Sequence, residues 1–483
     1  MDVLFVTSEL YPLIKTGGLA DVAGALPPAL ALEDCRVRTL LPGYRRVMEA
    51  LGETELVTVL EDHFGGDTRL LKARAGELDL LILDAPGLYD RPGNPYVDAD
   101  GKDWPDNATR FAALSAAAAQ IGHGLIGDWR PDLIHAHDWQ AGLTPAYLAT
   151  AGGKRPATVI TVHNLAFQGQ FPAEMLKSLR LPASMFQVAG LEYYGQIGFL
   201  KAGLFYADKI TTVSPTYAQE IQTAEQGMGL DGLLRGRSGD LVGIVNGVDE
   251  QVWDPATDRH LKTPYTFETI EKKTLNKKAL QERFGLDTDP DRPLFIVITR
   301  LTWQKGMDLL AVALPNLVAS GAHLALLGSG EAVLEKSFRD AASDHPGQVG
   351  CILGYDEPLS HLMQGGADAI LIPSRFEPCG LTQLYGLRYG TLPVVARVGG
   401  LADTVIDANE AGLRADAATG VQFTDLTPLG LSAAIDRTVA LFAQKPVWRA
   451  MQKRAMVSDV GWQSSAKAYK ALYREAIEGR QAV

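Results

Sequence analysis

Cysteine is scarce in this chain, with three residues in 483, Cys35, Cys351 and Cys379, and no Cys-x-x-Cys pair. This number and spacing argue against a disulfide framework and a cysteine-based zinc site, and they indicate a reducing compartment. Long apolar runs are also missing. The first one ends at Glu9, too short for a signal-peptide core, and none approaches the roughly 18 residues of a membrane span. We therefore expect a cytoplasmic protein with no membrane partner.

An excess of positive charge is lacking as well. The net charge is −12, which opposes nonspecific binding to nucleic acid or anionic lipid, because both are polyanions. Any anionic ligand must then be held by local cations. A hydrophobic content of 46% and a charged content of 21% are typical of ordinary globular proteins. No sequence period recurs, and the chain is too long for one core, so we expect two domains of about 200 to 250 residues.

Short apolar runs alternate with helix-length amphipathic stretches, the pattern of parallel sheets covered by helices. We predict a first series of strands at 3–7, 37–41, 80–84, 133–137, 159–163, 210–213 and 242–245. A second series is predicted at 294–299, 324–327, 351–353, 370–373, 394–396 and 421–423. The fold class is therefore α/β, with two doubly wound, Rossmann-like domains. Their predicted bounds are 1–245 and 246–455, with a hinge and linker from Asn246 to Pro290 and a C-terminal segment, 456–483, whose helix begins near Trp462.

The octet from Lys15 to Val22 follows the first predicted strand and contains the pair Gly17-Gly18 between Lys15 and Asp21. Glycine lets a backbone come close to a ligand, and the helix predicted to follow turns its positive dipole end toward the same place. The octet matches neither a Walker A loop nor a GxGxxG. A plain strand-to-helix turn is the alternative.

Two cations follow the strand at 294–299, since Arg300 and Lys305 lie five residues apart at its carboxyl end. Arginine offers a bidentate fork and lysine a compact charge, so the pair suits a diphosphate that gains charge as it leaves. A solvated surface pair is the alternative.

A carboxylate, Glu377, and a predicted helix start follow the strand at 370–373. We expect the helix to open at Gly380-Leu381-Thr382, directly after Cys379, with its first amides available to an anion. Glu377 could instead cap this helix or pair with Arg375.

Polar residues also lie at the carboxyl ends of two strands of the first series: His135, His137 and Asp138 at one, His163 and Asn164 at the next. A metal site is one interpretation of three histidines. We expect His135 and His137 to point to opposite faces and not to share a metal, and we interpret both as scaffold.

The sequence offers little else for a metal. The Asp-x-Asp sequences at 98–100 and 287–289 lie in polar loops without a preceding apolar strand, and chance produces such short patterns in acidic chains. We therefore expect the basic pair to take over the electrostatic role of a metal. No pair of carboxylates at nucleophile and acid positions emerges from the spacing.

Together these motifs, over residues 1 to about 470, resemble those of bacterial glycogen synthases and plant starch synthases. The octet is similar to their N-terminal signature, and the segment around Glu377, Cys379 and Gly380 to their E-x-C-G-L motif. The second acidic position of the looser E-x₇-E pattern falls at Tyr385, as in the synthase branch. The resemblance implies a retaining α-1,4-glucosyltransferase of the GT-B fold, with a cleft between its domains and a C-terminal helix that crosses back to the first domain. It also implies ADP-glucose and an α-1,4-glucan such as glycogen as substrates, with no cofactor and no metal.

The resemblance further implies roles for individual residues. Lys15, Gly17 and Gly18 would approach the diphosphate, and Arg300 and Lys305 would neutralise it. Glu377, His163 and Asp138 would hold the donor sugar. The remaining substrate-binding candidates are Asp21 and Asn164, the acceptor-side Asn246, Tyr355 stacked on adenine, and Cys379, Gly380, Leu381 and Thr382 around the distal phosphate.

Other functions stay open at this point. A UDP-glucose-dependent transferase, a phosphorylase-like enzyme with pyridoxal phosphate and a nucleotide-sugar epimerase share related folds. A non-catalytic glucan-binding protein would need exposed aromatic platforms, and the aromatic residues, 8% of the chain, are spread evenly.

Overall fold

A computed structural model describes residues 1–481, and the chain divides into two compact units. Unit 1 comprises Met1–Asn246 together with the C-terminal segment from Trp462, and unit 2 comprises Gly247–Gly461. The C-terminal segment therefore belongs to the first unit from Trp462 onward, whereas residues 456–461, which the sequence analysis assigned to that segment, lie in unit 2. None of the helices formed by residues 1–481 is long and apolar enough to cross a membrane.

Unit 1 is built on a nine-stranded sheet in the order β12-β11-β7-β6-β1-β2-β5-β4-β3. Its parallel strands are β1 (Asp2–Val6), β2 (Arg36–Pro42), β5 (Leu78–Asp84), β6 (Leu133–His137), β7 (Ala157–Val162), β11 (Lys209–Thr212) and β12 (Leu241–Gly243). All seven match strands predicted from the sequence. The sequence analysis missed two antiparallel strands, the edge strand β3 (Glu55–Leu60) and its neighbour β4 (Thr68–Ala75).

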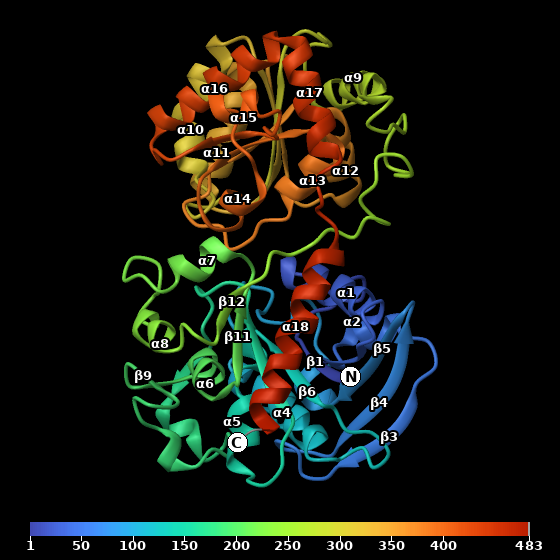
Figure 1. Cartoon of the computed structure of the whole chain (residues 1–483), viewed down its shortest axis with the longest axis vertical. Helices are drawn as coiled ribbons and strands as arrows, with labels where there is room; N and C mark the ends of the chain where they lie inside the picture. Colours follow the sequence, from blue (N-terminus) through green and yellow to red (C-terminus); the bar gives the residue numbers. More distant parts are fainter. Residues whose placement is uncertain (482–483) are drawn as a thin grey trace. The chain divides into compact units, whose positions relative to one another are not determined.

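Alternate residues of β1 face opposite sides of this sheet, as the two-residue period of a strand requires. Val3 and Phe5 pack with α1 (Gly18–Ala31) and α18 (Trp462–Gln481), while Leu4 and Val6 belong to the larger core that includes α4 (Asn107–Gly122). The C-terminal helix thus returns to the first unit, and Figure 1 shows it, in red, beside α1. This confirms the helix predicted to begin near Trp462.

The other helices of unit 1 are short, and most follow the strands of the sheet. They are α2 (Arg45–Ala50), α3 (Pro86–Tyr89), α5 (Thr144–Thr150), α6 (Phe199–Tyr206), α7 (Pro215–Glu220) and α8 (Asp231–Gly236). The sequence analysis also did not predict a small antiparallel sheet, which consists of β8 (Gln170–Pro172), β10 (Gln196–Gly198) and β9 (Glu192–Tyr193).

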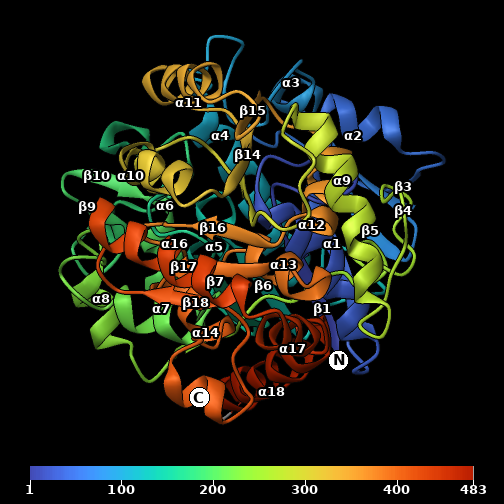
Figure 2. The ribbon, with the colours of Figure 1, turned by 90° about the horizontal axis from the view of Figure 1, so that it is seen from above.

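Unit 2 contains a six-stranded parallel sheet in the order β15-β14-β13-β16-β17-β18. Its strands are β13 (Leu294–Ile298), β14 (His323–Gly328), β15 (Val349–Leu353), β16 (Ala369–Ile372), β17 (Leu392–Ala396) and β18 (Val421–Phe423). Figures 1 and 2 show helices on both faces of this sheet. They are α9 (Lys273–Phe284), α10 (Met307–Ala319), α11 (Ala332–Asp344), α12 (Glu357–Gly366), α13 (Thr382–Tyr389), α14 (Gly399–Thr404), α15 (Glu410–Arg414), α16 (Pro428–Ala443) and α17 (Lys445–Met456). All six strands match the predicted second series, so the doubly wound α/β fold is confirmed in both units.

Helix α9 corrects the prediction that the chain is a linker through Pro290. Its composition is polar, yet Lys273 and Lys277 are buried because their side chains have partners. Lys277 Nζ pairs with Asp368 at 2.7 Å, and Lys273 Nζ donates to Gln364 O at 2.8 Å. An apolar pattern cannot reveal a helix whose buried face is lined with satisfied polar groups.

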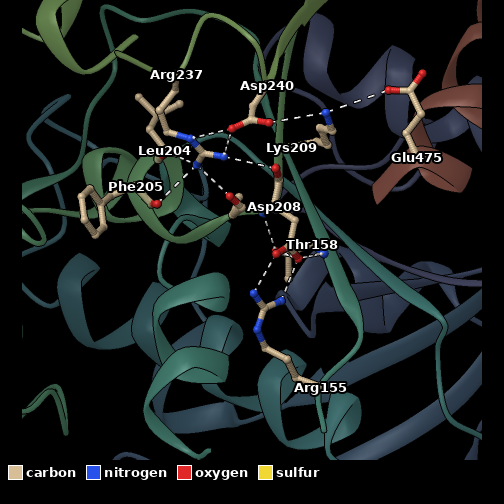
Figure 3. Close-up of polar contacts among 10 residues, drawn as sticks. Arg155, Thr158, Leu204, Phe205, Asp208, Lys209, Arg237, Asp240 and Glu475 are labelled. Atoms are coloured by element: carbon tan, nitrogen blue, oxygen red, sulfur yellow. Dashed lines mark hydrogen bonds and ion pairs between the residues drawn. The ribbon is translucent and has the colours of Figure 1, made fainter. Parts of the chain in front are cut away.

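Arg237 ties the end of α6 to the amino ends of β11 and β12 (Figure 3). Its guanidinium pairs with Asp240 at 2.8 Å and donates to four main-chain carbonyl oxygens, those of Leu204, Phe205, Ala207 and Asp208. The last carbonyls of a helix have no partner within the helix, so one side chain here satisfies several of them.

We expect Arg237→Ala to lower the free energy of unfolding by about 2 to 3 kcal/mol, because it leaves part-buried carbonyls without a donor. Urea denaturation measures this. Arg235→Ala is the matched control, since Arg235 is exposed and its partners among residues 1–481 are Asp231 in its own helix and Gln222 O. It should change stability by less than about 0.5 kcal/mol. Equal effects of the two substitutions would contradict the assigned role of Arg237.

Candidate active site

The loop from Lys15 to Gly18 is held by a buried carboxylate that the sequence analysis did not single out. Glu9 accepts hydrogen bonds from Thr16 N at 2.5 Å, from Gly17 N at 3.1 Å and from the hydroxyls of Thr16 and Tyr96, both at 2.6 Å. The Gly17 amide, expected to face a phosphate, is thus already donated to Glu9. The only sequence signal for Glu9 is the position of an acidic residue just beyond the first strand. Its burial is seen in the structure alone.

The two charged residues of the octet also meet. Lys15 Nζ lies 2.8 Å from Asp21 Oδ1, and both side chains are about one quarter exposed, at 26% and 22%. Asp21 lies in the first turn of α1, which starts at Gly18. The octet is therefore a strand-to-helix loop whose cation is oriented by a carboxylate.

Asp138 follows β6 with φ 55° and ψ −169°, a backbone conformation that non-glycine residues rarely adopt. Its Oδ1 accepts the main-chain N–H of His163 at 2.7 Å. Burial raises the pKa of this carboxyl from its ordinary 3.8 to about 7. A strained, buried carboxylate at the carboxyl end of a parallel strand is typical of a functional position.

The pKa of Asp138 predicts a pH dependence of stability. Because the pKa is raised in the folded state, this group destabilises the fold increasingly as the pH rises from about 4 to about 7. Asp138→Asn has no carboxyl to ionise, so its stability relative to the wild type should improve by about 2 kcal/mol between pH 5 and pH 8. Denaturation of both proteins at the two pH values measures this difference. A difference independent of pH would contradict the assignment.

The three histidines form a continuous cluster, which corrects one expectation. His135 and His137 are two residues apart on β6, so they share a face, and their ring centroids lie 4.1 Å apart. His137 Nδ1 lies 3.0 Å from His163 Nε2. Burial lowers the pKa of all three, that of His163 to about 3, so the cluster is neutral at pH 7.

In unit 2, the predicted basic pair and the predicted carboxylate meet. Strands β13 and β16 are neighbours, so the loops that follow them lie side by side. Lys305 Nζ donates to Glu377 Oε2 at 2.6 Å, and the Ser374 hydroxyl donates to the same oxygen at 2.9 Å. Both charged side chains are mostly buried, with 17% and 9% exposed. Arg300 stands at the carboxyl end of β13 and is exposed.

The close approach of these two loops requires Gly306. It has φ +68°, and a Cβ at this position would lie 1.9 Å from Pro373 O.

The alternative prediction, that Arg375 pairs with Glu377, is wrong. Arg375 forms a bidentate pair with Asp308, both distances 2.7 Å. The cation that pairs with Glu377 is therefore Lys305.

Four of the remaining candidates, Cys379, Gly380, Leu381 and Thr382, lie at the start of α13, which begins at Thr382 with Leu381 as its N-cap. Gly380 has φ +73°, and Cys379 is buried. Tyr355 follows β15 and is 71% exposed, so its ring is accessible, while its hydroxyl donates to Glu357.

Asn246, the last residue of unit 1 before the chain enters unit 2, is buried, and its Oδ1 has no partner among residues 1–481.

Neither Asp-x-Asp sequence forms a ligand cluster. Asp98 Oδ1 accepts the main-chain N–H groups of Asp100 and Lys102, both at 2.9 Å, and so closes a turn. Within the part of the chain that the structure describes, no group of three or more His, Cys, Asp or Glu side chains is arranged to hold a metal.

A cavity of about 370 Å³ in unit 1 lies away from these groups. It is lined by Lys209, Arg237, Asp240 and Glu475, among others, at the amino ends of β11 and β12 (Figure 3). In parallel α/β sheets ligands bind beyond the carboxyl ends of the strands. The candidate residues of unit 1 lie at that opposite edge, so this cavity is not the candidate site.

The two α/β units, each with polar and charged residues at the carboxyl edge of its parallel sheet, define a glycosyltransferase of two Rossmann-like domains. Family models agree in both parts: the starch synthase catalytic domain matches residues 2–236, and glycosyl transferases group 1 matches residues 279–426.

Known proteins resemble the chain over almost its whole length. A glycogen synthase from Rhodopseudomonas palustris is 58% identical over 477 residues, 99% of this chain and 98% of that protein. One from Roseobacter denitrificans is 56% identical over 481 residues, 99% of this chain and 100% of that protein. The solved catalytic domain of starch synthase IV from Arabidopsis thaliana, bound to ADP and acarbose, superposes with a TM-score of 0.89 at 31% identity, covering 99% of both chains.

The chain therefore belongs to the glycogen and starch synthase family. It is a retaining glycosyltransferase, as the sequence motifs implied, and the phosphorylase, the epimerase and the non-catalytic glucan-binding protein are set aside. A sucrose-phosphate synthase from Thermosynechococcus elongatus, at 17% identity and a TM-score of 0.60, shares the fold alone.

Proposed function

We propose that this enzyme transfers glucose from ADP-glucose to the non-reducing 4-hydroxyl of an α-1,4-glucan, with retention of configuration. The observation that carries the proposal is the pair of Lys305 and Glu377, which joins the ends of two neighbouring strands beside the start of α13. A cation, a carboxylate and the start of a helix in one place suit a sugar diphosphate.

The roles of the residues follow from the charge that develops in the reaction. As the bond between glucose C1 and the phosphate oxygen breaks, ADP gains negative charge, which Lys305 and Arg300 stabilise. Thr382 and the amides near Gly380 bind the distal phosphate, and Tyr355 offers an exposed ring for adenine. Glu377 orients the glucose hydroxyls.

The groups of unit 1 serve the sugars and the diphosphate. His163, Asn164 and Asp138 bind hydroxyls of the donor glucose, and Lys15, oriented by Asp21, approaches the diphosphate. The roles of the two glycines differ from those that the resemblance implied. The main-chain N–H of Gly17 donates to Glu9 and so shapes the loop, and Gly18 is the first residue of α1. Asn246 offers an unpartnered buried oxygen on the acceptor side.

We infer a front-face reaction. The sequence spacing provides no pair of carboxylates at nucleophile and acid positions. We therefore infer that the bond between C1 and the phosphate oxygen breaks, that C1 bonds to the acceptor 4-oxygen, and that the departing phosphate oxygen takes the proton of this 4-hydroxyl. Asp138, with a pKa of about 7, lies in unit 1 and contacts His163.

The decisive experiment incubates the protein with ADP-glucose and glycogen, and measures ADP release together with growth of the glucan. Equal concentrations of UDP-glucose test the choice of nucleotide. Stoichiometric ADP release with chain elongation supports the proposal. Faster turnover of UDP-glucose would overturn the ADP-glucose assignment, and no elongation with either donor would overturn the transfer reaction.

A cytoplasmic location is also proposed, supported by three free cysteines.

Metal independence is a further prediction, because Lys305 and Arg300 supply the positive charge that a metal supplies elsewhere. We expect the dialysed enzyme to keep full activity in EDTA. The same assay with added Mg²⁺ or Mn²⁺ is the control. Activity that disappears in EDTA and returns only with one of these ions would contradict the prediction.

A further inference from the structure

His137 contacts a site residue without reaching the site itself. It is fully buried on β6, packed against Phe5 with ring centroids 4.6 Å apart and against His135. Its Nδ1 lies 3.0 Å from Nε2 of His163. The other ring nitrogen, Nε2, is buried and has no hydrogen-bond partner among the described residues.

The contact between the two rings restricts their protons. Both imidazoles are neutral, because burial lowers the pKa of each below its usual range. A neutral imidazole has one N–H donor and one bare acceptor nitrogen. Exactly one of the two facing nitrogens must therefore carry a proton, and the choice fixes the tautomers of both rings.

The two arrangements differ at the buried Nε2 of His137. If His137 carries its proton on Nε2, a buried N–H group has no acceptor, which native proteins rarely tolerate. If His137 carries its proton on Nδ1, this N–H donates to His163 and only a lone pair is left unpaired at Nε2. The second arrangement places the proton of His163 on its own Nδ1.

Nδ1 of His163 is the nitrogen that remains for a ligand. No protein partner of this atom occurs among residues 1–481, and the His163 side chain is only half-buried. The main-chain N–H of His163 donates to Asp138, so the residue is fixed at both its backbone and its ring. Its ring orientation is thus set before any substrate binds.

We propose that His137 is a positioning residue that holds His163 as the Nδ1–H tautomer, so that His163 offers a hydrogen-bond donor to a sugar hydroxyl oxygen. The identity of the sugar rests on the proposed function; the tautomer does not. A donor at this position selects a hydroxyl oxygen with a free lone pair and leaves the hydroxyl proton available to an acceptor, which a bare nitrogen would not.

Long-range ¹H–¹⁵N NMR of histidine-labelled protein at pH 7.5 tests the tautomer directly, without substrate. The signals of His163 are assigned by their loss in His163→Phe. We expect a protonated, pyrrole-type Nδ1 and a bare, pyridine-type Nε2. The reverse pattern, or two protonated nitrogens, would overturn the proposal, and this measurement stands even if no variant of His137 folds.

His137→Leu then tests the positioning role, with His135→Leu as the matched control. His135 is an equally buried histidine on the same strand, but its ring nitrogens bond to Tyr473 and Thr161 and not to His163. In His137→Leu we expect averaged ¹⁵N shifts for His163 and a loss of about tenfold in kcat/KM per folded molecule. In His135→Leu the shifts of His163 should stay those of the wild type.

Unchanged His163 shifts in His137→Leu would show that His137 does not fix the tautomer. Equal losses of kcat/KM in both variants would make His137 merely structural. Either result overturns the positioning role. A wild-type protein inactive toward ADP-glucose would instead overturn the proposed function and leave the NMR result valid.

Discussion

Lys305→Ala should lower kcat by about 100-fold or more, roughly 3 kcal/mol, the scale of losing one preorganised electrostatic group. Lys305 is 17% exposed and is already oriented by Glu377, so its charge acts on the leaving phosphate with little reorganisation. Affinity for ADP should fall as well, because the same charge binds the ground-state diphosphate. Initial rates and calorimetric titration of ADP measure the two effects.

Lys336→Ala is the control for this substitution. Lys336 lies in the same unit, is exposed and pairs only with Asp340 one helical turn away. Its removal should leave kcat unchanged. Thermal unfolding of both variants separates a catalytic loss from unfolding, since Lys305→Ala leaves a buried carboxylate without its cation. A folded Lys305→Ala enzyme with kcat within about threefold of the wild type would contradict the role assigned to Lys305.

Much of the fold could be predicted because burial in a parallel sheet leaves a direct trace in the sequence. Strands buried on both faces are short apolar runs, as in β13, and all thirteen predicted runs are strands. The edge strand β3 and its neighbour β4 are partly exposed and mix polar with apolar residues, so they do not stand out. Helix α9 was missed because its buried face contains paired lysines.

The site was predictable only in part, because motifs mark loops and not contacts. Lys305 and Glu377 were each expected at strand ends, but their pairing depends on the adjacency of β13 and β16, which are not consecutive in the sequence. Glu9 was not singled out and His137 was interpreted as scaffold, because the importance of each lies in its contact with Gly17 or with His163. Such contacts are set by tertiary packing, and a single sequence contains no signal for them.

Three cations near the candidate residues of the two units are each paired with a carboxylate. Lys15 pairs with Asp21, Lys305 with Glu377, and Arg375 with Asp308. Each cation is thereby oriented before a ligand arrives, although part of its charge is offset by a carboxylate. A diphosphate must then compete with Glu377 for Lys305, so Glu377 opposes nucleotide binding while it orients the sugar.

This competition predicts opposite effects on binding and on turnover at Glu377. Glu377→Gln removes the negative charge beside Lys305 and keeps the size of the side chain, so ADP should bind as tightly as to the wild type or more tightly. The kcat/KM for ADP-glucose should nevertheless fall by about 100-fold, because an amide is a weaker acceptor for the glucose hydroxyls and no longer fixes Lys305. Calorimetry with ADP and initial rates with ADP-glucose measure both quantities.

Ser374→Ala is the matched control, since it removes only the hydroxyl that donates to the same Glu377 oxygen at 2.9 Å. We expect this variant to lose no more than about tenfold in kcat/KM. The comparison with Lys305→Ala is decisive because loss of the cation should weaken ADP binding, whereas loss of the carboxylate charge should not. If Glu377→Gln weakened ADP binding as much as Lys305→Ala does, the carboxylate would be a support for the lysine alone and would not contact the glucose.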